Sequence, residues 1–157
     1  MQAETKQQPQ RPGIGVAVLV WDTVSKKLLA SRRKDNKLIA FPGGHLEKYE
    51  SWEETGSREL KEECALEVAA SEMKLVGVFN VICQEKNYHY VTFAVICKYP
   101  ADQKIVNLEP EKHDDWEWVS IEEIKALKNE ERFYTITYMI EQLGEKFGAE
   151  YFDSLFK

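Results

Sequence analysis

Residues 43–66 read GGHLEKYESWEETGSRELKEECAL, the most informative part of the sequence. The paired glycines at its start break any regular element. Ser51, with Glu54 three residues later, forms a capping box, which predicts that a helix begins here and continues to Leu66. Residues 44–66 hold seven glutamates and only three basic residues. The sequence therefore predicts a glycine-rich loop that leads into a strongly acidic helix.

Three glutamates of this helix, Glu59, Glu62 and Glu63, are spaced at i, i+3 and i+4. Their side chains share one side of the helix, within roughly 100° of arc. Like charges on one face repel, and Mg²⁺ and Mn²⁺ prefer carboxylate oxygens, so the cluster indicates a metal site. A solvated acidic face is the commoner fate of a charge run and stays open as the alternative. Exposed carbonyls expected near Gly43, and Arg58 within the cluster, favour the metal site.

On the N-terminal side, the sequence predicts three strands. Residues 13–21 (GIGVAVLVW) form an apolar run that is too continuous for a strand with one wet face, which indicates a buried central strand. Residues 26–33 are its predicted hairpin partner, and residues 37–41 form a short strand that ends at the Pro-Gly-Gly break. Residues 1–12 hold four Gln and two Pro and are expected to form a flexible tail. A single domain is expected over residues 13–157.

On the C-terminal side, two long β-rich runs are predicted at residues 73–84 and 88–99, joined by a short hairpin turn. Residues 116–119 (WEWV) alternate like an edge strand. A second helix is expected to begin at Ser120, which opens another capping box, and a third is expected over residues 132–146. The strands come in hairpin runs rather than in strict alternation with helices. This order indicates an α+β fold, in which helices pack on both faces of a mixed sheet.

Composition and charge exclude several classes of protein. The chain has 157 residues, a net charge of −6 and 43% hydrophobic residues, which fits a soluble globular protein rather than a disordered one. Its longest apolar stretch is far shorter than the ~20 residues that a membrane span needs, and its polar N-terminus has no secretory signal. With three widely spaced cysteines, expected to be reduced, the chain is predicted to be cytoplasmic. An acidic chain binds polymeric nucleic acid poorly, so a phosphate-bearing ligand must meet local basic groups or a metal.

The acidic stretch resembles the signature of the Nudix hydrolases, G-x5-E-x7-R-E-U-x-E-E-x-G-U, in which U is aliphatic. The residues that match at the correct spacing are Gly44, Glu50, Arg58, Glu59, Leu60, Glu62, Glu63 and Leu66. One position departs, because Ala65 stands where the signature has the Gly that serves as a left-handed cap at the helix end. FPGGHLE, KNYHYVTF, NLEPEK and DDWEWVSIEEI are similar to segments of the small Nudix nucleoside triphosphate diphosphatases, including the subgroup that acts on thiopurine and other modified nucleotides.

This resemblance implies an α/β/α sandwich around a mixed sheet. It also implies hydrolysis of a nucleoside triphosphate, with a purine or a modified base, to a nucleoside monophosphate and pyrophosphate. The implied cofactor is Mg²⁺, with Mn²⁺ as the alternative, and the implied role is nucleotide-pool sanitation. Similar enzymes are often homodimers, so a homodimer stays open for this chain.

The resemblance assigns roles within the signature. Glu59 and Glu63 would be direct metal ligands. Glu62 would be a further ligand or would orient the attacking water, and the carbonyl of Gly43 would complete the shell. Arg58 would hold a carboxylate through a bidentate ion pair.

Other residues are candidates for structural roles or for substrate binding. Gly44 and Glu50 would be structural, with Glu50 fixing the loop or the helix start. Arg32, Arg33 and Lys34, at the end of a predicted strand, add positive charge near the phosphates or form an ordinary basic strand end. His45 follows the glycines and touches phosphate or base, or is purely structural. Thr92 matches a pocket wall of the resembled subgroup.

Phe133 and Tyr134 match a Phe-Trp pair that lines the base pocket in that subgroup, with core packing as the alternative. Glu109 and Glu111 flank a proline in a loop from which some Nudix enzymes take an extra ligand or base, and a solvated loop acid is the equal alternative. Two other functions stay open. One is a Nudix hydrolase of a nucleotide sugar or a dinucleotide such as ADP-ribose, and the other is a non-catalytic Nudix module that binds a ligand.

Overall fold

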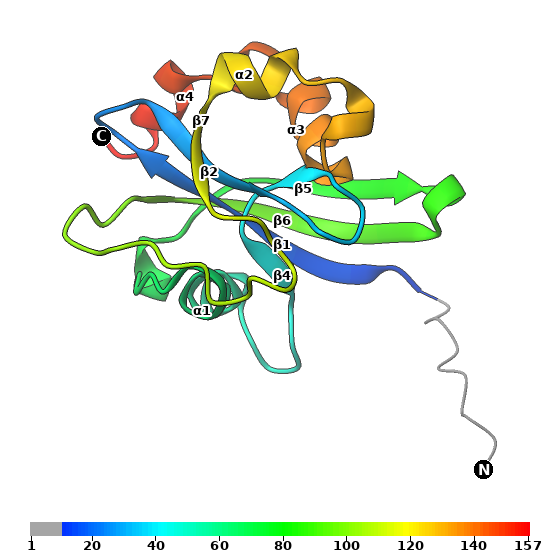
Figure 1. The fold of residues 1–157 in the computed structure, drawn as a ribbon, viewed down its shortest axis with the longest axis horizontal. Helices are drawn as coiled ribbons and strands as arrows, with labels where there is room; N and C mark the ends of the chain where they lie inside the picture. The colour runs from blue at the N-terminus through cyan, green and yellow to red at the C-terminus, as the bar shows by residue number, and fades with distance from the viewer. Residues whose placement is uncertain (1–10) are drawn as a thin grey trace.

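The computed structural model describes residues 11–157, and a mixed sheet of seven strands runs through its centre (Figure 1). The main path of the sheet has the order β3-β2-β1-β6-β5, while β4 pairs with β1 and β7 pairs with β2. β1 and β6 are parallel, and the other pairs are antiparallel. The strands are β1 (Gly13–Asp22), β2 (Lys27–Arg32), β3 (Ile39–Ala40), β4 (Gly43–His45), β5 (Lys74–Cys83), β6 (Tyr88–Lys98) and β7 (Glu117–Ser120). Most of the expected N-terminal tail, residues 1–10, lies outside the described residues.

β1 is the central strand that the continuous apolar run predicts. It lies between β2 and β6, and its pairing with β6 extends from Gly13 opposite Tyr90 to Trp21 opposite Lys98. All side chains from Val18 to Trp21 are completely buried. Both faces of this part of the strand are therefore covered, which explains why its sequence lacks polar alternation.

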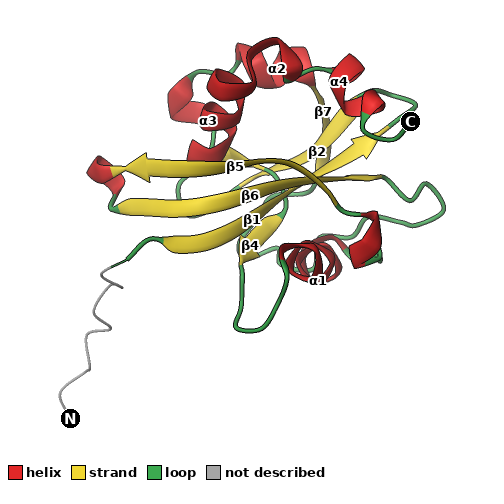
Figure 2. Ribbon diagram, turned by 180° about the vertical axis from the view of Figure 1, so that it is seen from behind, coloured by secondary structure: helices red, strands yellow, loops and turns green. Residues whose placement is uncertain are grey.

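Helices cover both faces of the sheet, which confirms the predicted α/β/α sandwich (Figure 2). The α-helices are α1 (Trp52–Cys64), α2 (Ile121–Ala126), α3 (Tyr134–Leu143) and α4 (Ala149–Ser154), and short 3₁₀ helices lie at Ala70–Glu72, Gln84–Lys86, Asn129–Glu131 and Gly144–Lys146. α1 packs on one face, where Leu60 joins an apolar cluster with Val18 and Val95. α2, α3 and α4 cover the other face, where Met139 and Phe152 join the second cluster. The chain thus has a separate core on each side of one sheet.

Two predicted elements differ from the structure. The glycines of the Pro-Gly-Gly break also belong to a strand, β4, which pairs with β1. This close pairing is possible because Gly43 (φ 153°) has no Cβ, and a Cβ there would overlap the backbone of β1. The expected helix over residues 132–146 is shorter, because α3 spans only Tyr134–Leu143 and is followed by Gly144, which adopts a positive φ of 55°. A further helix, α4, follows and was not predicted.

The predicted capping box of α1 is present. Ser51 Oγ accepts a hydrogen bond from the backbone N–H of Glu54 (3.1 Å), and Glu54 Oε2 accepts one from the N–H of Ser51 (2.8 Å). The helix ends at Cys64, and Ala65 adopts the left-handed conformation (φ 58°, ψ 26°) that the signature assigns to Gly. The alanine therefore keeps the cap geometry, at a conformational cost. Every helix within residues 11–157 is too short or too polar to cross a membrane.

Candidate active site

The acidic face of α1 lies against the glycines of β4. Glu59 and Glu63 are only 8% and 6% exposed, whereas Glu62 remains half exposed. The backbone N–H of Gly43 donates a hydrogen bond to Glu63 Oε2 (3.3 Å). A Cβ on Gly44 would overlap the carboxylate of Glu59. The glycines thus let two buried carboxylates approach the backbone closely, which larger residues would prevent.

Arg58 organises these carboxylates. Its Nε donates to Glu50 Oε1 (2.8 Å), and its Nη1 donates to both Glu59 Oε1 (3.0 Å) and Glu62 Oε2 (3.2 Å). Its Nη2 donates to the carbonyl of His45 (3.0 Å). The guanidinium therefore bridges several groups and does not form the expected bidentate pair with one carboxylate. The reason is that three carboxylates reach it from different directions.

Electrostatics at this site favour a cation. Burial raises the pKa of both Glu59 and Glu63, and the nearby charge of Glu59 contributes to a pKa of about 9 for Glu63. Two adjacent buried carboxylates that share only the charge of Arg58 are costly to ionise, and a divalent ion would offset that cost. Within residues 11–157 no group of three or more His, Cys, Asp or Glu side chains is already arranged to hold a metal ion. Arg58 engages oxygens of Glu59 and Glu62, so a cation would have to share these carboxylates with it.

A loop from the C-terminal half of the chain closes the other side of this site. The N–H groups of Val106 and Leu108 donate to the carbonyls of Cys64 (3.0 Å) and Glu63 (3.2 Å), and the indole N–H of Trp116 also donates to Glu63 O (3.1 Å). These bonds satisfy carbonyls at the end of α1, which a helix leaves unpaired. The loop residues that line the resulting carboxylate cavity are Glu109, Glu111, Lys112 and His113. The structure thus places both distal glutamates in the same cavity as the signature carboxylates.

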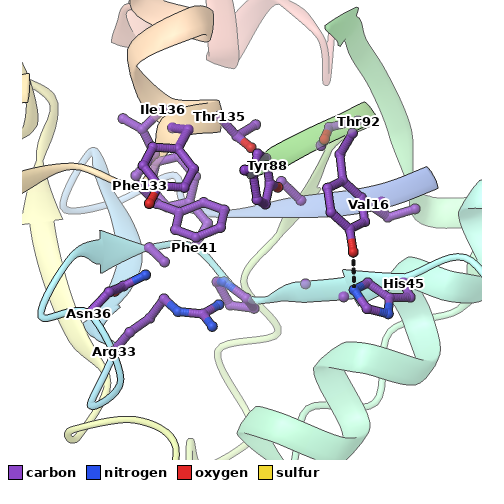
Figure 3. A pocket seen from close by; sticks show the side chains of 18 of the residues that line it. Val16, Arg33, Asn36, Phe41, His45, Tyr88, Thr92, Phe133, Thr135 and Ile136 are labelled. Atoms are coloured by element: carbon purple, nitrogen blue, oxygen red, sulfur yellow. Dashed lines mark hydrogen bonds between the residues drawn. The ribbon is translucent and has the colours of Figure 1, made fainter. Parts of the chain in front are cut away.

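A second cavity, of about 390 Å³, opens beside the carboxylate cavity (Figure 3). Its aromatic lining residues are Phe41, Tyr88, Tyr90, Phe133 and Tyr134. We refer to it as the aromatic cavity. The residues that line both cavities are Arg33, Asp35, Phe41, Gly43, Gly44 and His45. An elongated ligand can therefore extend from one cavity into the other.

The aromatic rings form one continuous wall. The Tyr88 ring centre lies 4.7 Å from that of Tyr90 and 4.9 Å from that of Tyr134. Tyr90 stacks on His45 (5.3 Å), and its hydroxyl lies 3.1 Å from His45 Nε2, as the dashed line in Figure 3 marks. Burial raises the pKa of Tyr88 to about 12, so its hydroxyl is neutral. Phe133 and Tyr134 are half-buried, with contacts to both the cavity and the neighbouring rings.

Two polar residues of the aromatic cavity stand out. Arg33 donates from Nε and Nη2 to the two carboxylate oxygens of Asp35 (3.0 and 2.7 Å), and its guanidinium lies 5.0 Å from the ring centre of Phe133. Thr92 is 4% exposed, and its hydroxyl oxygen has no hydrogen-bond partner among the described residues. A buried hydroxyl without a partner is costly, so a ligand that supplied one would recover that cost.

The match to known proteins agrees with this geometry. The family model of the NUDIX domain matches residues 11–138. The chain belongs to the Nudix family. Similar solved structures include the MutT Nudix hydrolase of Burkholderia pseudomallei, with a TM-score of 0.72, 19% identity, and coverage of 85% of this chain and 99% of that one. The MutT protein of Methanosarcina mazei Go1 has a TM-score of 0.65 and 21% identity, covering 96% and 99%.

A third similar structure is a bifunctional NMN adenylyltransferase/ADP ribose pyrophosphatase of Francisella tularensis, solved in complex with AMP and a Mn ion. It has a TM-score of 0.65 and 22% identity, and the alignment covers 88% of this chain and 42% of that one. At these identities the similarity establishes the Nudix fold. Together with the family match it identifies the chain as a Nudix hydrolase, a family whose members use divalent metals and act on nucleotide substrates.

The structure brings the predicted Nudix residues together and adds others that the sequence analysis missed. The added lining residues include Asp35, Asn36, Tyr88, Tyr90 and His113. Strand alternation could have identified the two tyrosines, because residues two and four positions before Thr92 share its face. Nothing in the sequence pattern pointed to His113 or to Asp35, since their positions depend on contacts between distant segments.

Proposed function

We propose that this Nudix hydrolase converts nucleoside triphosphates that carry a purine or a modified base to a nucleoside monophosphate and pyrophosphate, with Mg²⁺ as cofactor. The observation that carries the proposal is the direct connection between the aromatic cavity and the carboxylate cavity. A volume of about 390 Å³ falls within the range of small-ligand sites, roughly 300–1,000 Å³. The proposal places the nucleoside in the aromatic cavity and the phosphates beside the carboxylates.

The aromatic cavity supplies two kinds of contact for a nucleoside. Its rings offer stacking surfaces, and stacking is worth roughly 1–3 kcal/mol per base while tolerating different bases. The unpartnered hydroxyl of Thr92 offers one directional contact to a polar atom of the ligand. Arg33, at the junction of the two cavities, is positioned to meet a phosphate that follows the nucleoside. This arrangement supports a broad substrate range with a modest preference for purines.

The carboxylate cavity supplies the proposed metal ligands, which are Glu59, Glu63, Glu62 and the carbonyl of Gly43. When bound there, Mg²⁺ neutralises phosphate charge, makes the phosphorus more electrophilic and acidifies a bound water. Arg58 holds one oxygen of Glu59 and one of Glu62, which fixes the direction of the remaining oxygens. The N–H of Gly43 does the same for Glu63.

A panel of substrates tests the proposal. The purified protein is incubated with Mg²⁺ and dGTP, dCTP, 8-oxo- and thiopurine triphosphates, ADP-ribose and a dinucleoside polyphosphate, and the products are identified by chromatography. Monophosphate and pyrophosphate from the purine or modified triphosphates support the proposal. Cleavage of ADP-ribose or of the dinucleotide alone would assign the second Nudix function instead. Binding without cleavage of any compound would indicate a ligand-binding module.

A further inference from the structure

His113 is a buried histidine of the carboxylate cavity to which the proposed function gives no role. It is 7% exposed, and its ring centre lies 5.2 Å from that of Trp116. Its backbone pairs with Arg33 in an isolated antiparallel bridge. Directly opposite residues of an antiparallel pair project their side chains to the same face. Since both residues line the carboxylate cavity, His113 and Arg33 form neighbouring parts of one wall.

The hydrogen bonding of the ring determines which nitrogen carries its proton. Nδ1 of His113 is buried and has no partner among the described residues. A cationic imidazole would need acceptors for two N–H groups. In proteins, a buried N–H group that lacks an acceptor is rarer than a buried acceptor atom that lacks a donor, so the unpartnered Nδ1 is expected to carry no proton. The arrangement therefore favours a neutral ring with its proton on Nε2, the nitrogen left to face the cavity.

An N–H group in this position suits an anion better than a metal. Histidines that bind metals almost always donate their other ring N–H to an acceptor, and Nδ1 of His113 has none. The other nearby cation of the loop, Lys112, is paired with Glu109 (2.8 Å). His113 thus presents an N–H donor on the same wall as Arg33, in a cavity that otherwise presents mainly carboxylates.

We propose that Nε2–H of His113 donates a hydrogen bond to the pyrophosphate part of the substrate, the phosphates farthest from the nucleoside. Arg33 lines both cavities, whereas His113 lines only the carboxylate cavity. A phosphate chain that begins at the aromatic cavity therefore passes Arg33 before it reaches His113. The assignment of the phosphates rests on the proposed function.

Two conservative variants distinguish the nitrogens. A glutamine amide can place an N–H near the position of Nε2, whereas an asparagine amide reaches only the position of Nδ1. His113→Gln should therefore retain pyrophosphate binding within about threefold, and His113→Asn should weaken it about tenfold or more, as expected for a lost hydrogen bond to a charged group. Binding is measured by calorimetry with magnesium pyrophosphate and, separately, with GMP. GMP binding should change less than twofold in both variants.

His89→Gln is the matched control, because His89 lies outside both cavities and bonds to Asn80 on the neighbouring strand (2.7 Å). It should bind pyrophosphate as the wild type does, and thermal unfolding of all variants verifies folding. Equal pyrophosphate affinity in the wild type and in folded His113→Asn would overturn the inference. Equal losses for pyrophosphate and GMP would also overturn it. If no nucleotide is hydrolysed in the substrate panel, the proposed function fails, while the pyrophosphate measurement still tests the role of His113.

Discussion

Replacement of Arg58 by lysine tests how the carboxylate cavity is organised. Arg58 uses three nitrogens to bond to four acceptors, which belong to Glu50, Glu59, Glu62 and His45. Lysine keeps the charge but has one nitrogen, which cannot occupy the positions of all three guanidinium nitrogens. At least two of the four hydrogen bonds should therefore be lost in Arg58→Lys.

The structure gives the expected size of this effect. A hydrogen bond to a charged group is worth about 1.5–3 kcal/mol. Two lost bonds correspond to about 3–6 kcal/mol. If they orient the carboxylates in the transition state, kcat should fall by about two to four orders of magnitude, since ~1.4 kcal/mol corresponds to a tenfold change. Loss of the link between α1 and Glu50 should also lower Tm by several degrees, because ~1 kcal/mol shifts Tm by about 2–4 °C in a chain of this size.

Pyrophosphate release at saturating Mg²⁺ and substrate is the assay, with thermal unfolding in parallel. Arg32→Lys is the matched control, because Arg32 lines neither cavity and bonds to the backbone of Lys37. Its kcat should stay within twofold of the wild type. A folded Arg58→Lys protein with more than a third of the wild-type kcat would refute the reasoning, because a simple positive charge would then suffice.

Four further substitutions give expectations for metal binding, nucleotide binding and stability. Glu63→Gln should lower kcat by orders of magnitude at saturating Mg²⁺, and more than a tenth of the wild-type rate would contradict a role as metal ligand. Without metal, the raised pKa of Glu63 means that the folded state holds more protons than the unfolded state between about pH 4.5 and about pH 9. The free energy of unfolding of the wild type should therefore fall as the pH rises through this range. In Glu63→Gln, which lacks this carboxyl, it should fall less. Tyr134→Ala should raise KM for nucleotides about tenfold with unchanged metal dependence, because a stacking surface is lost, and unchanged kcat/KM would show a packing role only. Thr92→Val should leave the unfolding free energy equal or higher in urea titrations but raise KM, because it removes an unpartnered hydroxyl; a destabilised variant with normal KM would contradict this. Ala65→Gly should raise Tm by a few degrees with unchanged kcat, since Ala65 occupies a left-handed conformation that glycine adopts more easily. As the control, Ala126→Gly should lower Tm, because Ala126 lies within the helix α2.

The sequence was most informative where local rules apply. The capping box at Ser51 correctly predicted the start of α1, and helical spacing correctly predicted that Glu59 and Glu63 share a face. The cap position was also correctly located at Ala65, because a helix end needs a left-handed residue whatever the side chain. These features depend on residues that are close in the sequence.

Features built from distant segments were not predictable in the same way. β4 exists because Gly43 lacks a Cβ and can approach β1, which the paired glycines alone did not reveal. His113 reaches the carboxylate cavity because its loop pairs with Arg33 and caps the end of α1 at Glu63. Strand alternation places Tyr90 on the face of Thr92, but only the packing of α3 shows that this face borders a cavity.

The distribution of unpartnered polar atoms links stability to function. Three buried side-chain atoms of the described residues have no hydrogen-bond partner, and two of them, Thr92 Oγ1 and His113 Nδ1, belong to residues that line the two cavities. Each such atom costs roughly 1–3 kcal/mol in the free protein. The buried pair of Glu59 and Glu63 adds a further electrostatic cost at the same place. A chain optimised only for folding would place apolar groups at these positions, so their concentration at the cavities supports the proposal that a polar, phosphate-bearing ligand and its cation bind there. The ligand contact proposed for His113 is made by Nε2, while Nδ1 stays buried.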